Sequence, residues 1–400
     1  MRRIYLDNAA TTAVHPAVVE AMLPYLTEFF GNASSIHWYG QQSKKAVAKA
    51  RRQVASLIGA DENEIVFLSG GTEADNLAVI GIAEAFSDRG RHVVTSAIEH
   101  PAVLKACEHL ASRGWSITTV PVSAGGVVDV ADVRAAICDE TTVVSIMTVN
   151  NEIGTIQPIA DIAAVVRERK AAGQTHLHLH TDGVQAVGKI PVDVRDLGVD
   201  LLSIAGHKLH APKGVGALFV RKGVRLSARQ FGGHQERGRR PGTEAVPMIV
   251  ALGAACELAR ERIGDRGLHT GELRDRLESG IRNRIPNVGF NGDPAKRVPH
   301  IANISFGDVH GEGLLISLDL KGVAVATGAA CSSGSVEPSH VLVALGIDRE
   351  RIHGSLRFSL SESNTEAEID DVLDILTEVI ERLRVDADLD AGTQAVSGSD

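Results

Sequence analysis

The strongest constraint on the fold is an alternation of helical and strand patterns between about residues 40 and 220. The expected strands are Ile65–Leu68, His92–Ser96, Val143–Val149, His176–Thr181 and Leu201–Ala205, with helical patterns at 72–86, 102–111 and 159–171. Such alternation predicts an α/β fold with a mostly parallel sheet covered by helices. Ligand-binding residues are then expected at the carboxyl ends of the strands.

Beyond about residue 250, long charged helical patterns flank short strands, which indicates a second, α+β unit. A chain of 400 residues also exceeds the roughly 250–300 residues that one hydrophobic core usually serves. We expect a large domain over residues 15–255 and a small domain built from residues 1–14 and 256–385. The polar residues 386–400 are expected to form a disordered tail.

Charge and composition exclude several classes of protein. The net charge is −9 and Lys and Arg form no long run, which argues against nucleic acid as the main partner. The chain starts without the apolar stretch of a signal peptide, and no run approaches ~18 apolar residues, so no membrane span is expected. The four cysteines are widely spaced, which fits neither a disulfide framework nor a zinc motif and favours the cytoplasm.

One of these cysteines, Cys331, lies in the segment Thr327–Ser335, where every other side chain is small. No neighbour in that segment can pack the thiol into a core, and two glycines loosen the backbone. The thiol is therefore either a displayed nucleophile or an ordinary free cysteine in a loop.

Two further segments suggest a phosphorylated aldehyde as ligand. Ser69-Gly70-Gly71-Thr72 lies between a strand and a helix, where backbone N–H groups can bind phosphate, although an ordinary tight turn fits the same residues. Lys208 follows the strand at 201–205, and a lysine near a phosphate site can form an imine with an aldehyde.

Asp182 follows another strand and could pair with a protonated pyridine nitrogen. A competing interpretation remains open, because His176, His178 and His180 alternate along that strand and would share one face that could bind a metal. Arg357 could hold a substrate carboxylate as a bidentate fork. Taken together, these residues indicate a pyridoxal-phosphate enzyme that acts on an amino acid.

The whole set of motifs resembles the cysteine desulfurases of the NifS/IscS family, which are pyridoxal-phosphate enzymes of fold type I. The resemblance extends over nearly the whole chain, and its motifs are Tyr5–Thr12, Ser69–Glu73, Glu99–Val103, Val149–Glu152, His180–Gln185, Cys331–His340 and Arg357–Leu360. Two segments, Gly206–Gly214 and Gly232–Arg240, resemble the nitrogen-fixation NifS branch in particular.

The resemblance implies a role for each matching residue. Lys208 would hold the cofactor, Asp182 would face its ring nitrogen and His100 would stack on the ring and assist catalysis. Asn151 and Gln185 would bind the phenolic side, and Asn151 with Arg357 would bind the substrate. Gly71, Thr72 and His207 would bind phosphate, with Thr243 reaching in from the second subunit of a homodimer. One departure is Ala205, where family members often carry a phosphate-binding serine.

The implied reaction converts L-cysteine to L-alanine and leaves the sulfur as a persulfide on Cys331. The segment around Cys331 would move to pass that sulfur to a scaffold protein for iron–sulfur assembly, with the persulfide as a possible transient cluster ligand. No resident metal is expected. The alternatives are a selenocysteine or cysteine lyase, a class V aminotransferase, or a scaffold without activity.

Overall fold

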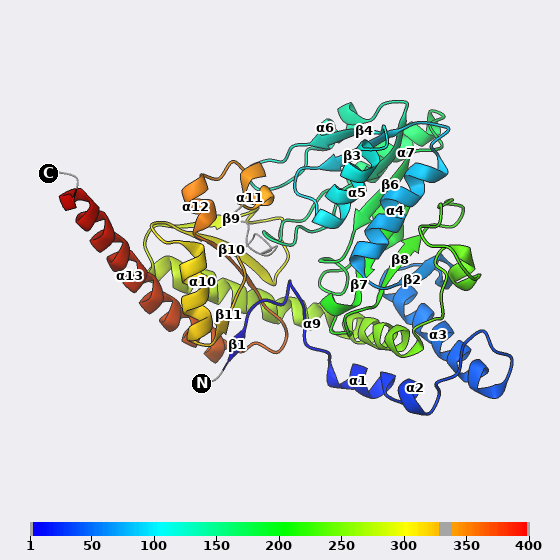
Figure 1. Cartoon of the computed structure of the whole chain (residues 1–400), viewed down its shortest axis with the longest axis horizontal. Helices are drawn as coiled ribbons and strands as arrows, with labels where there is room; N and C mark the ends of the chain where they lie inside the picture. The colour runs from blue at the N-terminus through cyan, green and yellow to red at the C-terminus, as the bar shows by residue number, and fades with distance from the viewer. Residues whose placement is uncertain (1–2, 328–337, 398–400) are drawn as a thin grey trace.

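The computed structural model describes residues 3–327 and 338–397, which form two groups of elements joined by one long helix (Figure 1). The larger group is built around a seven-stranded sheet, and the smaller one around a three-stranded sheet. A separate hydrophobic cluster lies in each group. The boundary between residues 255 and 256 stays a prediction, because the joining helix crosses it without a break.

The large sheet has the strand order β2-β8-β7-β6-β5-β3-β4. Its strands are β2 (Ile65–Leu68), β3 (His92–Ser96), β4 (Ser116–Val120), β5 (Thr141–Ser145), β6 (His178–Asp182), β7 (Leu201–Ala205) and β8 (Gly216–Val220). Strands β4, β3, β5, β6 and β7 run parallel, whereas β8 is antiparallel to both of its neighbours. The expected α/β fold with a mostly parallel sheet is confirmed.

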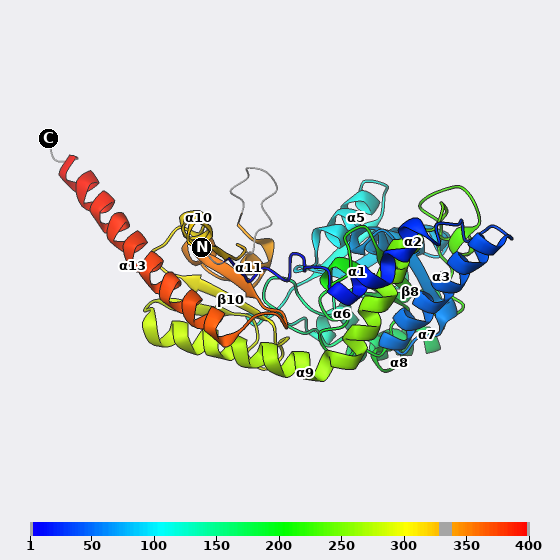
Figure 2. The ribbon, with the colours of Figure 1, turned by 90° about the horizontal axis from the view of Figure 1, so that it is seen from below.

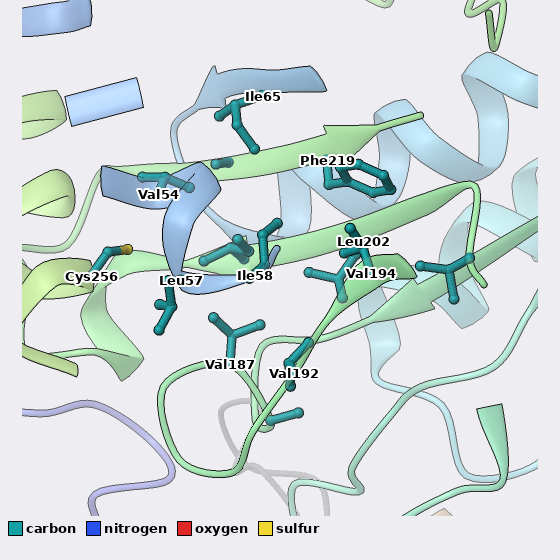
Figure 3. Close-up of a cluster of buried hydrophobic side chains, with 14 of the residues drawn as sticks. Val54, Leu57, Ile58, Ile65, Val187, Val192, Val194, Leu202, Phe219 and Cys256 are labelled. Atoms are coloured by element: carbon teal, nitrogen blue, oxygen red, sulfur yellow. The ribbon is translucent and has the colours of Figure 1, made fainter. Parts of the chain in front are cut away.

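Helices cover both faces of this sheet. They are α3 (Trp38–Leu57), α4 (Gly71–Ala85), α5 (Pro101–Ala111), α6 (Val130–Ala136), α7 (Ile159–Ala171) and α8 (Val194–Leu197), preceded by the short α1 (Pro16–Met22) and α2 (Pro24–Thr27). Figure 3 shows part of the larger core, where Val54 of α3 and the C-cap residue Ile58 lie near Leu202 of β7 and Phe219 of β8. Apolar β-branched and aromatic side chains on both faces keep these central strands buried.

The smaller group contains an antiparallel sheet with the order β12-β10-β9 and a parallel pair of short strands. The strands are β9 (Val288–Asn291), β10 (Ile301–Phe306) and β12 (Ser355–Ser359), with β1 (Ile4–Tyr5) paired to β11 (Val323–Ala324). The helices are α10 (Gly311–Leu320), α11 (His340–Ala344), α12 (Arg349–His353) and α13 (Glu366–Ser397). The N-terminal strand thus belongs to this group, although the rest of its sheet comes from beyond residue 280.

The joining helix, α9 (Val246–Arg284), runs along both groups (Figure 2). In the sequence the helical patterns at 257–262 and 271–283 are separate, and Gly264 and Gly267 lie between them. In the structure Ile249 and Leu252 bury in the larger core and Leu273 and Leu277 in the smaller one. Since each end is held by its own core, the helix continues through the glycines despite their low helix propensity.

Helix α13 differs from the sequence prediction at the C-terminus. Residues 386–400 were expected to be a disordered tail, but α13 continues to Ser397 (Figure 1). Residues 385–397 contain no proline and only one glycine, Gly392, so an existing helix can propagate through them at little cost. Within the described residues, no helix is both long enough and apolar enough to cross a bilayer.

Candidate active site

The carboxyl ends of β6 and β7 bring Asp182 and Lys208 to one edge of the large sheet. Asp182 is the last residue of β6 and is in register with Ser203 of β7. Strand β7 ends at Ala205, and Lys208 follows in a single 3₁₀ turn. Because neighbouring parallel strands end at the same edge, the sequence placed both residues correctly.

The Lys208 side chain reaches across to the N-terminal loop. Its Nζ donates to the carbonyl oxygen of Ala9 at 2.6 Å and to that of Ala10 at 2.5 Å. Burial and the nearby Arg357 guanidinium lower the pKa of Lys208 to about 8, against the opposing effect of Asp7 and Asp182. A lysine with this pKa is partly uncharged near neutral pH, and the uncharged amine is the form that attacks an aldehyde.

Asp182 is a buried carboxyl group with one hydrogen bond, which Oδ1 accepts from the Val184 N–H at 2.9 Å. Burial raises its pKa, while the charges of His100 and Lys208 act in the opposite direction. A buried carboxylate is costly unless a positive group pairs with it. A protonated pyridine nitrogen is such a group, so Asp182 fits the ring of the expected cofactor.

His100 is the N-cap of α5, and its Nδ1 accepts from the Ala102 N–H at 3.1 Å. The proton of the neutral ring therefore sits on Nε2. Burial lowers the pKa of His100, the charges of Lys208 and His340 lower it further, and Asp182 raises it. The structure thus brings His100 together with Asp182 and Lys208, as predicted, and a neutral imidazole there can stack on a planar ring.

The start of α4 contains the residues that are expected to form the phosphate cup. Gly70 is its N-cap and supplies no side-chain cap, so the first-turn N–H groups of this 15-residue helix are available to an anion. A Cβ on Gly71 would lie 3.0 Å from Val184 Cγ2, and Val184 is hydrogen-bonded to Asp182. The cup therefore adjoins Asp182, while Thr72 is exposed in the first turn. These residues fit a phosphorylated pyridine aldehyde.

The two other predicted phosphate ligands, His207 and Thr243, lie in different surroundings. His207 precedes Lys208, and its Nδ1 lies 3.2 Å from Thr11 Oγ1. Burial and nearby lysines lower the pKa of His207 to about 4, so a neutral ring N–H is its available donor. Thr243 is exposed in the loop before α9, and no hydrogen bond of the described residues joins it to Gly71 or Lys208.

Arg357 comes from β12 of the smaller sheet and is buried at the boundary with the larger group. Its Nη2 donates to Asp7 Oδ1 at 2.7 Å and its Nη1 to the Asn151 carbonyl oxygen at 2.9 Å, whereas Nε has no partner. Arg357, Asn151 and the N-terminal loop therefore meet, as a substrate site requires. Asn150, in contrast, holds its own turn by accepting from the Glu152 N–H.

Both the nitrogen and the oxygen of the Gln185 side-chain amide form hydrogen bonds within the chain. Its Nε2 donates to the Ala9 carbonyl oxygen at 2.9 Å, and its Oε1 accepts from Lys189 Nζ at 2.7 Å. The same carbonyl oxygen accepts from Lys208. Gln185 is thus next to the lysine as expected, and its binding to the phenolic side of a cofactor stays a prediction.

Cys331 lies outside the described residues, but both flanks of its segment are attached to the site. Ala326 forms a backbone bridge with Arg357, with N–O distances of 3.2 and 2.7 Å. Ser339 Oγ donates to Glu152 Oε2 at 2.5 Å, and His340 Nε2 lies 2.9 Å from the Glu99 carbonyl oxygen. The segment therefore starts beside Arg357 and ends beside His100.

The histidine alternative on β6 is not supported. His180 Nδ1 and Nε2 contact Ser145 Oγ and Ser203 Oγ at 2.9 and 3.0 Å, and the ring of His178 lies 4.7 Å from that of Phe86. His176 precedes the strand. Over residues 3–327 and 338–397, no three metal-ligating side chains form a group that could hold an ion.

Sequence reasoning missed two acidic residues near the site, Asp7 and Glu99. Asp7 is the carboxylate partner of Arg357. Glu99 is fully buried, accepts from Ser96 Oγ at 2.5 Å and from the Met147 N–H at 3.0 Å, and burial raises its pKa to about 8. Asp7 precedes Asn8 and Glu99 precedes His100, and both lie within the family-like motifs. Their spacing does not show which cation or hydroxyl each one contacts.

Comparison with known proteins agrees with this site. The chain matches the aminotransferase class-V family over residues 4–372. It is 49% identical to a cysteine desulfurase IscS of Methanosarcina thermophila over 383 residues, 96% of this chain and 93% of that protein. A solved NifS-like protein superposes with a TM-score of 0.89 at 37% identity, covering 95% of this chain and 100% of the other.

A second solved structure, described as SspA in complex with cysteine, superposes with a TM-score of 0.79 at 33% identity and covers 90% of this chain and 99% of its own. The family model accounts for most of the chain and includes both groups of elements. The buried Asp182, the low-pKa Lys208 and the uncapped start of α4 fit the cofactor of that family. The chain therefore belongs to the aminotransferase class-V family of pyridoxal-phosphate-dependent enzymes.

Proposed function

We propose that the protein is a cysteine desulfurase that converts L-cysteine to L-alanine and retains the sulfur on Cys331. The observation that carries the proposal is the attachment of both flanks of the Cys331 segment near the expected site. One flank forms a backbone bridge with Arg357, and the other hydrogen-bonds Glu152 and Glu99, the sequence neighbours of Asn151 and His100. The relatives support it, since they are named cysteine desulfurases at 49% identity, and one solved neighbour is described as a complex with cysteine.

Arg357 is the proposed carboxylate-binding residue. Its guanidinium has one contact with Asp7, one with a main-chain oxygen and a buried Nε without a partner. A buried guanidinium that retains an unused N–H group can donate a hydrogen bond to a further carboxylate oxygen. Asp7 keeps the guanidinium oriented toward the N-terminal loop that contacts Lys208.

Lys208 is the proposed anchor of the cofactor and the base at the substrate α-carbon. When bound, pyridoxal phosphate supplies an electron sink that stabilises the negative charge developing on that carbon. Asp182 holds a proton on the ring nitrogen, because a buried carboxylate favours a positive neighbour. The pKa of Lys208 near 8 allows its amine to take a proton at neutral pH and return it.

The Cys331 thiolate is the proposed sulfur acceptor. It attacks the substrate Sγ, a Cys331–sulfur bond forms, and the electron pair of the broken Cβ–Sγ bond stays with the carbon, which is protonated to give L-alanine. The transferred sulfur is oxidised and the carbon is reduced, so this step needs no outside reductant. Release of the sulfur needs a thiol or another acceptor. A free thiol has a pKa of about 8.5, so a base must help to form the thiolate, and His100 is the proposed base.

We further propose a cytoplasmic homodimer that delivers sulfur to an iron–sulfur scaffold protein, in a nitrogen-fixation setting suggested by the two NifS-like segments. The dimer is supported by the exposed Thr243, which has no described contact with its own phosphate cup. It is also supported by exposed apolar side chains at the start of α3 and before it, since Phe30, Ile36 and Trp38 are 66%, 94% and 59% exposed.

Product analysis tests the activity. With L-cysteine and a thiol reductant, alanine and sulfide should appear in equal amounts, and Cys331→Ala should lose sulfide release. Cys138→Ala is the matched control, because Cys138 is the exposed described cysteine and lies away from the site. If Cys331→Ala released sulfide from cysteine at the original rate, the persulfide route would be wrong. A selenocysteine lyase would instead keep its turnover of selenocysteine in that variant.

A further inference from the structure

A small cavity of about 30 Å³ lies beside Lys208, between the N-terminal loop, α9 and the segment after β12. Lys208 is its only wall residue that also belongs to the predicted cofactor and substrate set. The phosphate cup, Asp182 and Arg357 do not line it. Its walls are Asn8, Thr12, Lys189, Lys208, His210, Arg266, Thr270, His300, Leu360 and Ser361. The cavity is therefore a separate compartment that shares one wall with the active site.

The charges facing this cavity are unbalanced. Among the residues that the structure describes, Lys189 Nζ bonds only the neutral Gln185 Oε1, and Lys208 Nζ bonds two main-chain oxygens. Neither ammonium has a carboxylate partner. Arg266, the third cation of the wall, is neutralised by Glu362 through two contacts of 3.0 Å. Two lysine amines thus face one cavity, and neither is paired with a carboxylate.

His300 adds a buried ring N–H that has no hydrogen-bond acceptor among the described residues. Its side chain is 4% exposed, and neither Nδ1 nor Nε2 has a hydrogen-bond partner. Burial, with Lys189 and nearby arginines, holds the pKa of His300 well below its usual value, so the ring is neutral and carries one N–H. Buried polar atoms are nearly always paired in folded proteins, so this N–H needs an acceptor.

The other polar wall residues are already satisfied within the chain. Thr12 Oγ1 donates to the His207 carbonyl oxygen at 3.0 Å, and Thr270 Oγ1 donates to that of Arg266 at 2.8 Å. His210 Nδ1 lies 3.0 Å from the Ala13 carbonyl oxygen. The donors left for a ligand are those of Lys189 and His300, and a ligand that accepts from both and opposes the positive charge is an anion.

We propose that this cavity binds one small monovalent anion of halide size, which accepts hydrogen bonds from Lys189 Nζ and the His300 ring. An anion there offsets the burial of Lys189, whose pKa is held well below its usual range by burial and by Lys208, Arg357 and Arg266. A cation is excluded by the surrounding charge. The cofactor phosphate has its own site at the start of α4, and the proposal does not depend on the reaction that the enzyme catalyses.

Bromide diffraction is the direct test. Crystals of the full chain with its cofactor, grown in sodium bromide, should show an anomalous scattering peak within hydrogen-bond distance of Lys189 Nζ and a His300 ring nitrogen. A Lys189→Met variant keeps the side-chain volume and should lose the peak. An ordinary water peak without anomalous signal at that position in the unaltered protein would overturn the proposal.

A solution measurement guards against binding that occurs only at crystal concentrations. Bromide or chloride, compared with gluconate at equal ionic strength, should raise the melting temperature of the unaltered protein. Lys189→Met should weaken halide binding at least about tenfold, because it removes the charged partner, and His300→Phe should also weaken it. Lys222→Met, at an exposed lysine after β8, should bind as before. Equal halide effects in all four proteins would refute the site, whatever the desulfurase assay shows.

Discussion

The two sides of the active site differ in what holds their side chains. Asp182 and Lys208 belong to the large sheet and sit at the ends of adjacent buried strands. Arg357 and the flanks of the Cys331 segment belong to the smaller group, and they reach the site through the Ala326 bridge and the Ser339–Glu152 hydrogen bond. Asp182 and Lys208 are thus held by the larger core, and Arg357 lies between Leu356 and Phe358 of the smaller one. Val341 and Leu342, which follow the Cys331 segment, pack in a third cluster with Ile98 and Met147 of the larger group.

This difference predicts that variants on the two sides of the site affect different steps. Changes on the large-sheet side should disturb the cofactor itself, whereas changes on the smaller side should leave the cofactor in place and alter substrate binding or sulfur transfer. Figure 1 shows that the long helix α9 runs along both groups. The following variants compare the two sides, from the largest expected effect to the smallest.

Lys208→Ala should have the largest effect, because it removes both the covalent anchor and the base. We expect alanine formation to fall by about 10⁴-fold and the visible absorption band of lysine-bound cofactor to disappear. Lys222→Ala is the matched control. Retention of the band in Lys208→Ala would show that another amine carries the cofactor.

Asp182→Asn should reduce kcat by about 10²-fold or more, as expected for loss of one preorganised electrostatic partner. The variant keeps the size of the side chain but cannot hold a proton on the ring nitrogen. Steady-state kinetics and the absorption spectrum should both change. Kinetics within twofold of the unaltered protein would remove Asp182 from this role.

Arg357→Lys should act on the substrate alone. The lysine keeps the charge but loses the planar fork, so KM for L-cysteine should rise by about tenfold while the cofactor band stays unchanged. Competition by a carboxylate inhibitor gives a second measure. A lost band with an unaltered KM would contradict the proposed division between the two sides.

Leu277→Ala should test the independence of the two cores. Leu277 is fully buried in the smaller cluster, so its truncation should lower the free energy of unfolding of that group by about 2–5 kcal/mol. Urea unfolding followed by the cofactor band and by far-ultraviolet circular dichroism should then separate into two transitions. Leu202→Ala, in the larger core, should instead shift both probes together.

Glu99→Gln should have the smallest effect and should concern pH. Burial raises the pKa of Glu99 from 4.5 to about 8, so the folded protein keeps a proton that the unfolded chain releases. The stability contribution of this proton is present at low pH and declines as pH rises from about 5 to 8, by up to about 1 kcal/mol per pH unit. The variant should show a shallower decline in thermal unfolding over that range, and an unchanged slope would count against a protonated Glu99.

The sequence predicted the large-sheet side of the site better than the other side. Asp182 and Lys208 could be found because each follows a short apolar strand, and strand ends meet at one edge. The pairing of Asp7 with Arg357 spans 350 positions in the chain, and no local pattern records it. The same holds for Lys189 and His300, whose shared cavity exists only after α9 packs against both groups.

The helices show a similar limit. Glycines in α9 and polar residues at the end of α13 are typical of helix ends. Packing against two cores nevertheless keeps α9 continuous, and α13 propagates through its polar end. The departure at Ala205 also gains meaning in the structure, because its methyl group lies 3.4 Å from a Cβ built on Gly71. A serine there would add a hydroxyl next to the phosphate cup.

The most direct test of the account is the fate of the substrate sulfur. The protein, loaded with cofactor and kept free of reductant, is mixed with L-cysteine, digested and examined by mass spectrometry. The account predicts one added sulfur atom on the peptide that contains Cys331, together with an equal amount of L-alanine. Alanine formed while that peptide stays unmodified, or sulfur found on Cys138 instead, would contradict it.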